Sequence, residues 1–223
     1  VVQYPQGWLS TPLERTGQMQ ASWRTDPKQT GAGGSIGDIG IHAANLAEYF
    51  TGLRITELNA DITSFVEGRP VDDDANVLLR FDNGAKGVLF CSQISVGEEN
   101  NLAIWIYGTK KGLEWHQEEP NFLYLKDGDN PVQIWKRGNA YVGNYSEAAA
   151  RGTRLPSGHP EAMLESIANH YNNFADTIRK VDAGEEPSEL ILDFPNVQDG
   201  VRGMKFIDAV IKNTTNNEKW TSI

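Results

Sequence analysis

Several residue types and patterns that mark particular protein classes are scarce or missing in this sequence. Among 223 residues there is one cysteine, Cys91, which excludes a disulfide scaffold and a multi-cysteine zinc site. No stretch approaches eighteen consecutive apolar residues, as a membrane-spanning helix requires. Lys and Arg number 20 against 30 Asp and Glu, so the net charge of −10 provides no basic field for nucleic acids or anionic membranes. We therefore expect a protein of the reducing cytoplasm that binds neither nucleic acid nor membrane.

What is present is enough apolar surface for a sizeable core. Hydrophobic residues make up 39% of the chain, and there are six Trp, seven Tyr and eight Phe. The length fits one large domain or two small ones. Val1-Val2-Gln3-Tyr4 has the pattern of a strand already under way, without an initiator Met. This beginning predicts that the chain is part of something longer.

Hydrophobic periodicity predicts three helices, over residues 35–50, 160–182 and 196–212. Pro160 suits the first position of the second helix. The apolar faces of the first and third helices are expected to point inward, and they comprise Ile39, Ala43, Leu46 and Phe50, then Val197, Val201, Met204, Ile207 and Ile211. The second helix carries a continuous apolar stripe from Met163 to Val181.

The region between the first and second helices has the pattern of strands joined by tight turns. Seven short runs rich in β-branched and aromatic residues are predicted as strands, at residues 62–66, 75–81, 87–94, 102–107, 112–115, 122–125 and 133–135. Turns such as Asp82-Asn83-Gly84 separate them, which favours an antiparallel meander. Residues 138–157, and those between the first strand and residue 35, are predicted as polar loops. The fold class is therefore α+β: an open, mainly antiparallel sheet with helices packed on one face and the other face bare.

A dense glycine stretch occupies residues 31–37 and leads into the first helix. One interpretation is a dinucleotide-binding loop, but that motif follows a hydrophobic strand, and here the preceding residues are polar and interrupted by Pro27. The others are a tight entry into the helix and a backbone that must approach a ligand closely.

Asp38 and His42 are four residues apart on this first helix, so both side chains project from one face. A carboxylate beside an imidazole can orient the ring and stabilise its protonated form for acid–base catalysis. An ordinary surface pair has the same spacing. Three acids in a row, Asp72 to Asp74, have no metal-ligand spacing and are predicted to form a solvated turn; no metal site is expected.

Two further features are candidates for ligand contacts. His159 precedes Pro160 and is expected at a helix N-cap, where free backbone N–H groups lie nearby. Trp23-Arg24 offers a flat stacking surface and a fork of donors, although a Trp that anchors the loop to the core fits equally well. The two other histidines, His116 and His170, lack a carboxylate partner at useful spacing and are taken as structural.

Taken together, these motifs resemble the glucose–fructose oxidoreductase/inositol dehydrogenase family, also called Gfo/Idh/MocA. Residues 33–42 are similar to its GG-x-x-x-D-x-x-x-H motif, and Trp23-Arg24 to its upstream tryptophan–arginine pair. The run from Gly158 to Glu161 resembles a loop-to-helix element of one branch, and Asp199-Gly200 also fits. The resemblance implies an N-terminal Rossmann domain followed by a C-terminal α/β domain. Residues 1–223 match the second as a single substrate-binding and oligomerisation domain, and the Glu-Lys-Pro motif with the family's catalytic Lys is absent.

For function, the resemblance implies the C-terminal part of an oxidoreductase that uses NAD or NADP on a sugar or polyol. His42 would then take the hydroxyl proton, and Asp38 would orient His42 and bind a neighbouring hydroxyl. His159 would bind the substrate, and Trp23 and Arg24 would lie near the nicotinamide. The chain would pair with copies of itself through its sheet and would be inactive alone. The alternative is a non-catalytic binding or scaffold module of the same fold.

Overall fold

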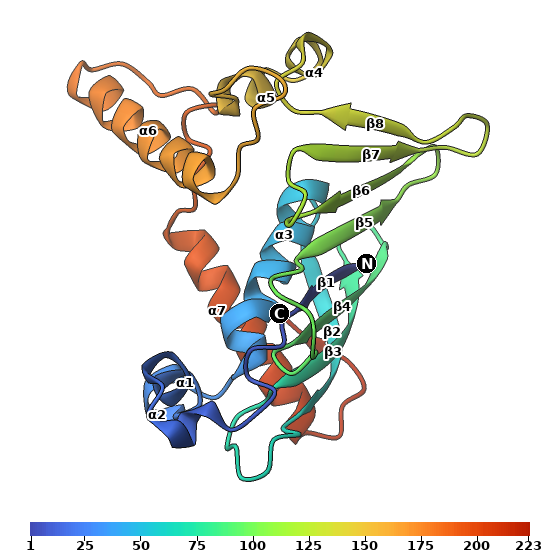
Figure 1. Ribbon diagram of the computed structural model, residues 1–223, viewed down its shortest axis with the longest axis vertical. Coiled ribbons are helices and arrows are strands. Elements are labelled where there is room, and N and C mark those ends of the chain that lie inside the picture. The colour runs from blue at the N-terminus through green and yellow to red at the C-terminus, as the bar shows by residue number, and fades with distance from the viewer. The chain divides into compact units, whose positions relative to one another are not determined.

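The computed structural model describes residues 1–223, and their contacts divide the chain into two compact units (Figure 1). The first unit comprises Val1–Tyr107, His116–Glu118 and Gly200–Ile223, and the second comprises Gly108–Trp115 and Glu119–Asp199. None of the helices is both long enough and apolar enough to cross a membrane.

The first unit contains an open sheet whose strands follow the order β5-β1-β4-β3-β2-β9. These strands are β1 (Val2–Pro5), β2 (Ile55–Thr63), β3 (Asp74–Phe81), β4 (Lys86–Ser92), β5 (Ala103–Tyr107) and β9 (Thr221–Ser222). Every neighbouring pair is antiparallel except β1 and β4, where Val2 lies opposite Leu89 in a parallel ladder. The α+β class with an open, mainly antiparallel sheet is confirmed. The parallel pair departs from a simple meander. It is possible because residues 6–85 separate the two strands and leave ample chain for a crossover.

The first predicted helix consists of two segments with different geometry. η2 (Ile36–Gly40) is a π-helical turn, and α3 (Ile41–Thr51) continues it as an α-helix along one face of the sheet (Figure 1). Ile39 and Ala43 are buried as expected, whereas Leu46 is half-buried and Phe50 is exposed. A π turn uses more residues than an α turn, so it rotates the following helix relative to the pattern of a regular helix.

The last helix, α7 (Val197–Thr215), faces the core with different residues from those predicted. Phe206, Ala209 and Val210 are buried, while Val197, Val201 and Met204 are exposed, so their predicted inward orientation is wrong. Polar contacts set the rotation of the helix: the Asn213 side chain accepts from the Ala60 amide at 2.7 Å, and Arg202 pairs with the buried Glu48 of α3.

Shorter helices fold the N-terminal region that precedes η2. They are the 3₁₀ turn η1 (Leu13–Thr16) and the helices α1 (Met19–Arg24) and α2 (Pro27–Thr30). α1 is capped by the Gln18 side chain and α2 by the Asp26 side chain, which accepts from the Lys28 amide at 3.0 Å. The prediction of a continuous polar loop was therefore wrong here.

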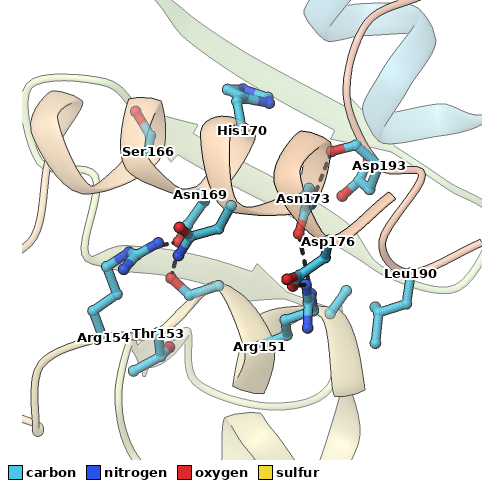
Figure 2. A pocket seen from close by; sticks show the side chains of 13 residues that line it. Arg151, Thr153, Arg154, Ser166, Asn169, His170, Asn173, Asp176, Leu190 and Asp193 are labelled. Carbon is cyan, nitrogen blue, oxygen red and sulfur yellow. Dashed lines mark hydrogen bonds and ion pairs between the residues drawn. The ribbon is translucent and has the colours of Figure 1, made fainter. Parts of the chain in front are cut away.

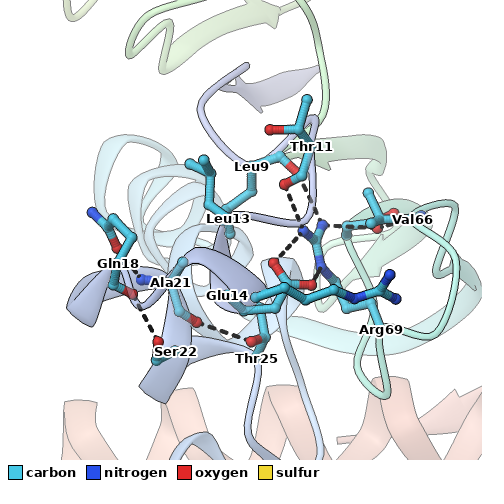
Figure 3. Close-up of polar contacts among 12 residues, drawn as sticks. Leu9, Thr11, Leu13, Glu14, Gln18, Ala21, Ser22, Thr25, Val66 and Arg69 are labelled. Carbon is cyan, nitrogen blue, oxygen red and sulfur yellow. Dashed lines mark hydrogen bonds and ion pairs between the residues drawn. The ribbon is translucent and has the colours of Figure 1, made fainter.

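A buried arginine fixes this N-terminal region to the connection between β2 and β3 (Figure 3). The Arg69 side chain is 1% exposed and donates to the carbonyls of Leu9 and Thr11, at 3.0 and 3.2 Å. It also forms ion pairs with Glu14 and Asp73, each at 3.0 Å. Asp73 in turn accepts from the amides of residues 65 and 66. Since all these groups are paired, the network holds the loop before α1 in one position.

The second unit contains a three-stranded antiparallel sheet and three helices. They are β6 (Gly112–His116, of which His116 belongs to the first unit), β7 (Phe122–Lys126), β8 (Gln133–Lys136), α4 (Ala140–Tyr145), α5 (Glu147–Gly152) and α6 (Met163–Asp182). α4 and α5 occupy a stretch that was predicted as a loop. α6 begins at Met163, so the predictions of Pro160 at the first helical position and His159 at the N-cap are wrong. The cause is Glu161, whose buried side chain binds the amides of Arg154 and Leu155 and keeps this segment out of the helix.

The apolar stripe of α6 is exposed along its length, and none of its side chains is buried. Its members are between 44% and 79% exposed, and they are Met163, Leu164, Ile167, Tyr171, Phe174, Ile178 and Val181.

Candidate functional site

The glycine stretch is anchored by the buried carboxylate of Asp72, which lies between β2 and β3. Asp72 accepts from the Gly34 amide at 2.6 Å, from the Ile36 amide at 2.8 Å and from the Ser35 hydroxyl at 2.7 Å. A Cβ atom on Gly34 would lie 2.0 Å from the Asp72 carbonyl oxygen, so only glycine permits this approach.

Two expectations about these residues change as a result. The Gly34 and Ile36 amides are already bound to a protein carboxylate, so this stretch does not cradle the phosphates of a dinucleotide. The close approach that the glycines allow is to Asp72 rather than to a ligand. Asp72 and Asp73 are 7% and 0% exposed, so the predicted solvated turn is wrong; their carboxylates are buried because each satisfies several donors.

Asp38 lies in the middle of the π turn that follows this anchor. Such turns occur frequently at functional sites. Its side chain is 24% exposed, and its Oδ2 atom accepts from Arg24 Nε at 2.9 Å and from Gln93 Nε2 at 2.7 Å. Its Oδ1 atom has no hydrogen bond within the chain. Asp38 therefore presents one engaged and one unengaged oxygen.

His42 follows Asp38 by one turn but makes no hydrogen bond to it. The exposed His42 ring lies edge-on to Tyr4 of β1, with 6.3 Å between the ring centroids. Tyr4 donates its hydroxyl to Asn100 at 2.7 Å, and Gln6 donates to the same Asn100 oxygen at 2.7 Å. Tyr4, whose hydroxyl is fixed by Asn100, is thus the aromatic neighbour of the His42 ring.

Trp23 and Arg24, at the end of α1, stack on each other. The Arg24 guanidinium lies 4.1 Å from the centroid of the Trp23 ring and 5.9 Å from that of Trp8. Arg24 Nη1 donates to the Gln20 side chain at 2.6 Å. Together with the bond to Asp38, these contacts hold the guanidinium in a single position beside the acid.

Sequence reasoning did not identify the residues that complete this cluster, namely Tyr4, Gln6, Trp8, Gln93 and Asn100. Gln93 bonds to a partner 55 positions away, and the bonds from Tyr4 and Gln6 to Asn100 span 96 and 94 positions. Contacts between residues so far apart in the chain cannot be inferred from the spacing of residues within one helix or strand. The sole local indication was the isolated Trp8 in a polar segment.

His159 belongs to the second unit, whereas Trp23, Arg24, Asp38 and His42 belong to the first. Its side chain is exposed, and its backbone carbonyl accepts from Arg137. Arg137 also pairs with the buried Glu161 at 2.9 Å, so the loop that carries His159 is fixed from two directions.

The second unit contains a pocket of about 440 Å³ between α5 and α6 (Figure 2). Arg151 donates to Asn173 at 3.1 Å and to Asp176 at 2.7 Å, and Arg154 donates to Asn169 at 2.8 Å. These polar groups engage one another across the pocket and so hold α5 against α6. The candidate site is therefore the cluster around Asp38. No group of three or more His, Cys, Asp or Glu side chains in the chain is arranged to hold a metal ion.

Comparison with known proteins gives a clear family assignment. Residues 2–114 match the model of the GFO/IDH/MocA C-terminal domain, a range that includes Trp23, Arg24, Asp38 and His42. The chain belongs to this family. This chain is 30% identical to the uncharacterized oxidoreductase YfiI of Bacillus subtilis, and the match covers 98% of this chain and 56% of that protein.

Solved structures agree with this assignment. An oxidoreductase from Sinorhizobium meliloti is 41% identical, with a TM-score of 0.81, over 98% of this chain and 55% of that one. An inositol dehydrogenase homolog from Azotobacter vinelandii, complexed with NAD+, is 30% identical with a TM-score of 0.86. The match covers 100% of this chain and 57% of that one. This GFO/IDH/MocA chain thus spans little more than half the length of these relatives.

Proposed function

We propose that this chain is the substrate-binding and dimerisation domain of an NAD(P)-dependent oxidoreductase that acts on a sugar or polyol hydroxyl. The observation that carries the proposal is the cluster in the first unit, where a carboxylate with one unengaged oxygen lies next to an arginine–tryptophan stack and one turn from His42. The homolog from Azotobacter vinelandii has also been solved with NADH and myo-inositol, and over the shared region it is 28% identical with a TM-score of 0.83.

In this proposal His42 is the general base and Asp38 is its acidic neighbour. Oxidation of a secondary alcohol requires a group that removes the hydroxyl proton, and an exposed imidazole suits that task near neutral pH. The charge of the Asp38 carboxylate, one helical turn away, favours the imidazolium that forms on His42. The Oδ1 atom of Asp38 accepts a hydrogen bond from a neighbouring hydroxyl of the substrate.

Trp23 and Arg24 fit the nicotinamide end of a cofactor, because a flat indole and guanidinium suit an aromatic ring. When bound, NAD or NADP accepts or donates the hydride. Binding of the cofactor's phosphates requires a preceding Rossmann domain, because the amides at Gly34 and Ile36 are engaged by Asp72. The catalytic Lys would come from the same domain, because the family's Glu-Lys-Pro motif does not occur in this chain. The chain alone is therefore expected to be inactive and to bind NAD(P)H weakly. A micromolar dissociation constant of the chain alone for either cofactor, measured by titration calorimetry, would contradict the proposal that the Rossmann domain binds most of the cofactor.

We also propose that copies of the chain pair through the bare face of the sheet, in the cytoplasm. Leu78 and Val88 lie opposite each other on β3 and β4, and both are more than 40% exposed on the face away from α3. Light scattering at micromolar concentration should give a dimer or larger assembly. Leu78→Lys should reduce the mass of the assembly, whereas Ile167→Lys on α6 should leave that mass unchanged. The reverse result would move the interface to α6.

Turnover by the full-length protein tests the catalytic assignment. His42→Ala should lower kcat roughly 10²- to 10⁴-fold, with a much smaller rise in KM, because a general base acts in the transition state. His170→Ala, on α6, is the control and should have little effect. Normal turnover by His42→Ala would refute the role of His42. A full-length protein that oxidises no polyol with either cofactor would favour the alternative, a binding or scaffold module.

A further inference from the structure

Two donors converge on a single oxygen atom of Asp38. Arg24 Nε and Gln93 Nε2 lie 2.9 and 2.7 Å from Oδ2, and neither bonds to Oδ1. A hydrogen bond to an ionised carboxylate is stronger than one between neutral groups. Two such bonds at one oxygen fix both the plane of the carboxylate and the direction in which Oδ1 points.

Gln93 is built into the first unit so that its amide has little freedom. Its side chain is buried, with the residue 2% exposed. Its backbone amide donates to the Asp73 carbonyl at 2.8 Å, and its carbonyl accepts from the Leu9 amide at 3.0 Å. Because a carboxylate accepts and does not donate, the nitrogen of the Gln93 amide must face Asp38. The residue therefore acts as a fixed donor behind the acid.

Arg24 is held equally firmly. Its Nη1 atom donates to Gln20, its guanidinium stacks on Trp23, and its Nε atom is committed to Asp38. The side chains of Arg24 and Asp38 are each 24% exposed, so the pair lies at the boundary between the core and solvent. A guanidinium committed in this way positions its partner carboxylate.

We propose that Arg24 and Gln93 are positioning residues that act through Asp38, so that Oδ1 is aimed at one particular hydroxyl of the polyol. This inference rests on the proposed function. It assigns to Gln93 a role that its sequence context does not reveal, and it gives Arg24 a task separate from contact with the nicotinamide. The substrate class that follows is a polyol with a second hydroxyl next to the carbon that is oxidised.

Double-mutant cycles in the full-length protein test this inference, with myo-inositol, levoglucosan and glucose 6-phosphate as probes and NAD+ or NADP+ as cofactor. Asp38→Asn should lower kcat/KM roughly 10²-fold. Gln93→Leu and Arg24→Lys should each lower kcat/KM roughly 10-fold, from the loss of one charge-assisted hydrogen bond. In the Asp38→Asn background each should cost less than about threefold, because residues that act through one group are not additive.

Two further variants separate positioning from general stability. Gln93→Glu keeps the size of the side chain but places a second carboxylate against Asp38, so it should be worse than Gln93→Leu. Asn213→Leu removes another buried amide, on α7, and it should reduce the urea midpoint while kcat/KM stays within twofold. A structural effect alone would make Gln93→Leu behave like Asn213→Leu.

The outcomes distinguish this inference from the proposed function. If Asp38→Asn lowers kcat/KM but the costs of Gln93→Leu and Arg24→Lys simply add to it, the positioning role is refuted and the proposed function stands. If Arg24→Lys instead raises KM for the cofactor tenfold in both backgrounds, Arg24 binds the nicotinamide and does not act through Asp38. If Asp38→Asn has no effect, or no probe is oxidised, the proposed function fails and this inference fails with it.

Discussion

Asp72→Asn should be among the most destabilising conservative substitutions in the chain. The Asp72 carboxylate is 7% exposed and receives three hydrogen bonds, from the Gly34 and Ile36 amides and from the Ser35 hydroxyl. These bonds connect the start of η2 to the β2–β3 connection, and η2 carries Asp38. An asparagine keeps one acceptor oxygen, loses the charge, and turns an NH₂ group toward at least one of the donors.

The size of the effect follows from the count of donors. A hydrogen bond to a charged group contributes about 1.5–3 kcal/mol, and a buried donor left without a partner costs about 1–3 kcal/mol. Since the three bonds share one acceptor group, their losses do not add fully. We expect Asp72→Asn to lower the free energy of unfolding by about 2–4 kcal/mol, against a typical domain stability of about 5–15 kcal/mol. Ser35→Ala removes one of the three bonds and should cost about 1–2 kcal/mol.

Urea unfolding followed by circular dichroism measures these differences, and hydrogen exchange locates them. The amides of Gly34 and Ile36 should exchange faster in Asp72→Asn, while the amides of β3 and β4 change only with global stability. Asp82→Asn, at an exposed turn, is the matched control and should stay within about 0.5 kcal/mol of the parent. A stability change in Asp72→Asn no larger than in this control, with unchanged exchange at Gly34 and Ile36, would refute the anchor.

Three further predictions concern Arg69, Glu14 and Cys91. Arg69→Met should lower the free energy of unfolding by about 3–5 kcal/mol, because it leaves Asp73 buried without its cation; a urea midpoint within error of the parent would contradict the network. Burial opposes ionisation of Glu14, but its hydrogen bond and attraction to Arg69 prevail and lower its pKa. Ionised Glu14 therefore stabilises the fold at neutral pH. The stability gap between the parent and Glu14→Gln should narrow as the pH falls below the ordinary pKa of a glutamate, about 4.3, and through the lowered value of the folded state, whereas a gap that does not change with pH would exclude this cause. Burial raises the pKa of the Cys91 thiol well above its ordinary value, so the native protein should not react with Ellman's reagent at pH 8, and a rapid reaction would show that Cys91 is accessible.

Most strands and the long helices were predictable because their evidence is local, although β2 lies at Ile55–Thr63 and was predicted at residues 62–66. β3, β4 and β7 were located to within two residues, since alternation and turns such as Asp82-Asn83-Gly84 fix them; Gly84 has a φ of +86° in that turn. The short helices were missed because each depends on one capping side chain. Gln18 caps α1, Asp26 caps α2 and Ser146 caps α5. The pattern of four to six residues is too short to show a helical period.

The candidate site was predictable in part for the same reason. Trp23, Arg24 and Asp38 lie close together in sequence, and the structure connects them through the Arg24–Asp38 bond. Gln93 could not be found, because it comes from the segment after β4 and contacts Asp38 only once the sheet has formed. The face that α3 turns toward the core could not be predicted from a regular helical period either, because the π turn that holds Asp38 rotates the helix that follows it.

The central place of β1 has a consequence for the order of folding. Val2 pairs with Leu89 on one side and with Ile104 on the other, so β1 joins β4 to β5. During synthesis β1 therefore has no partner until β4 (Lys86–Ser92) has also left the ribosome. Contacts of such long sequence separation form late and slowly, because the loop must close before they contribute. Until β1 has paired with them, the facing edges of β4 and β5 remain open. In this interval the nascent domain is most exposed to mispairing with other chains.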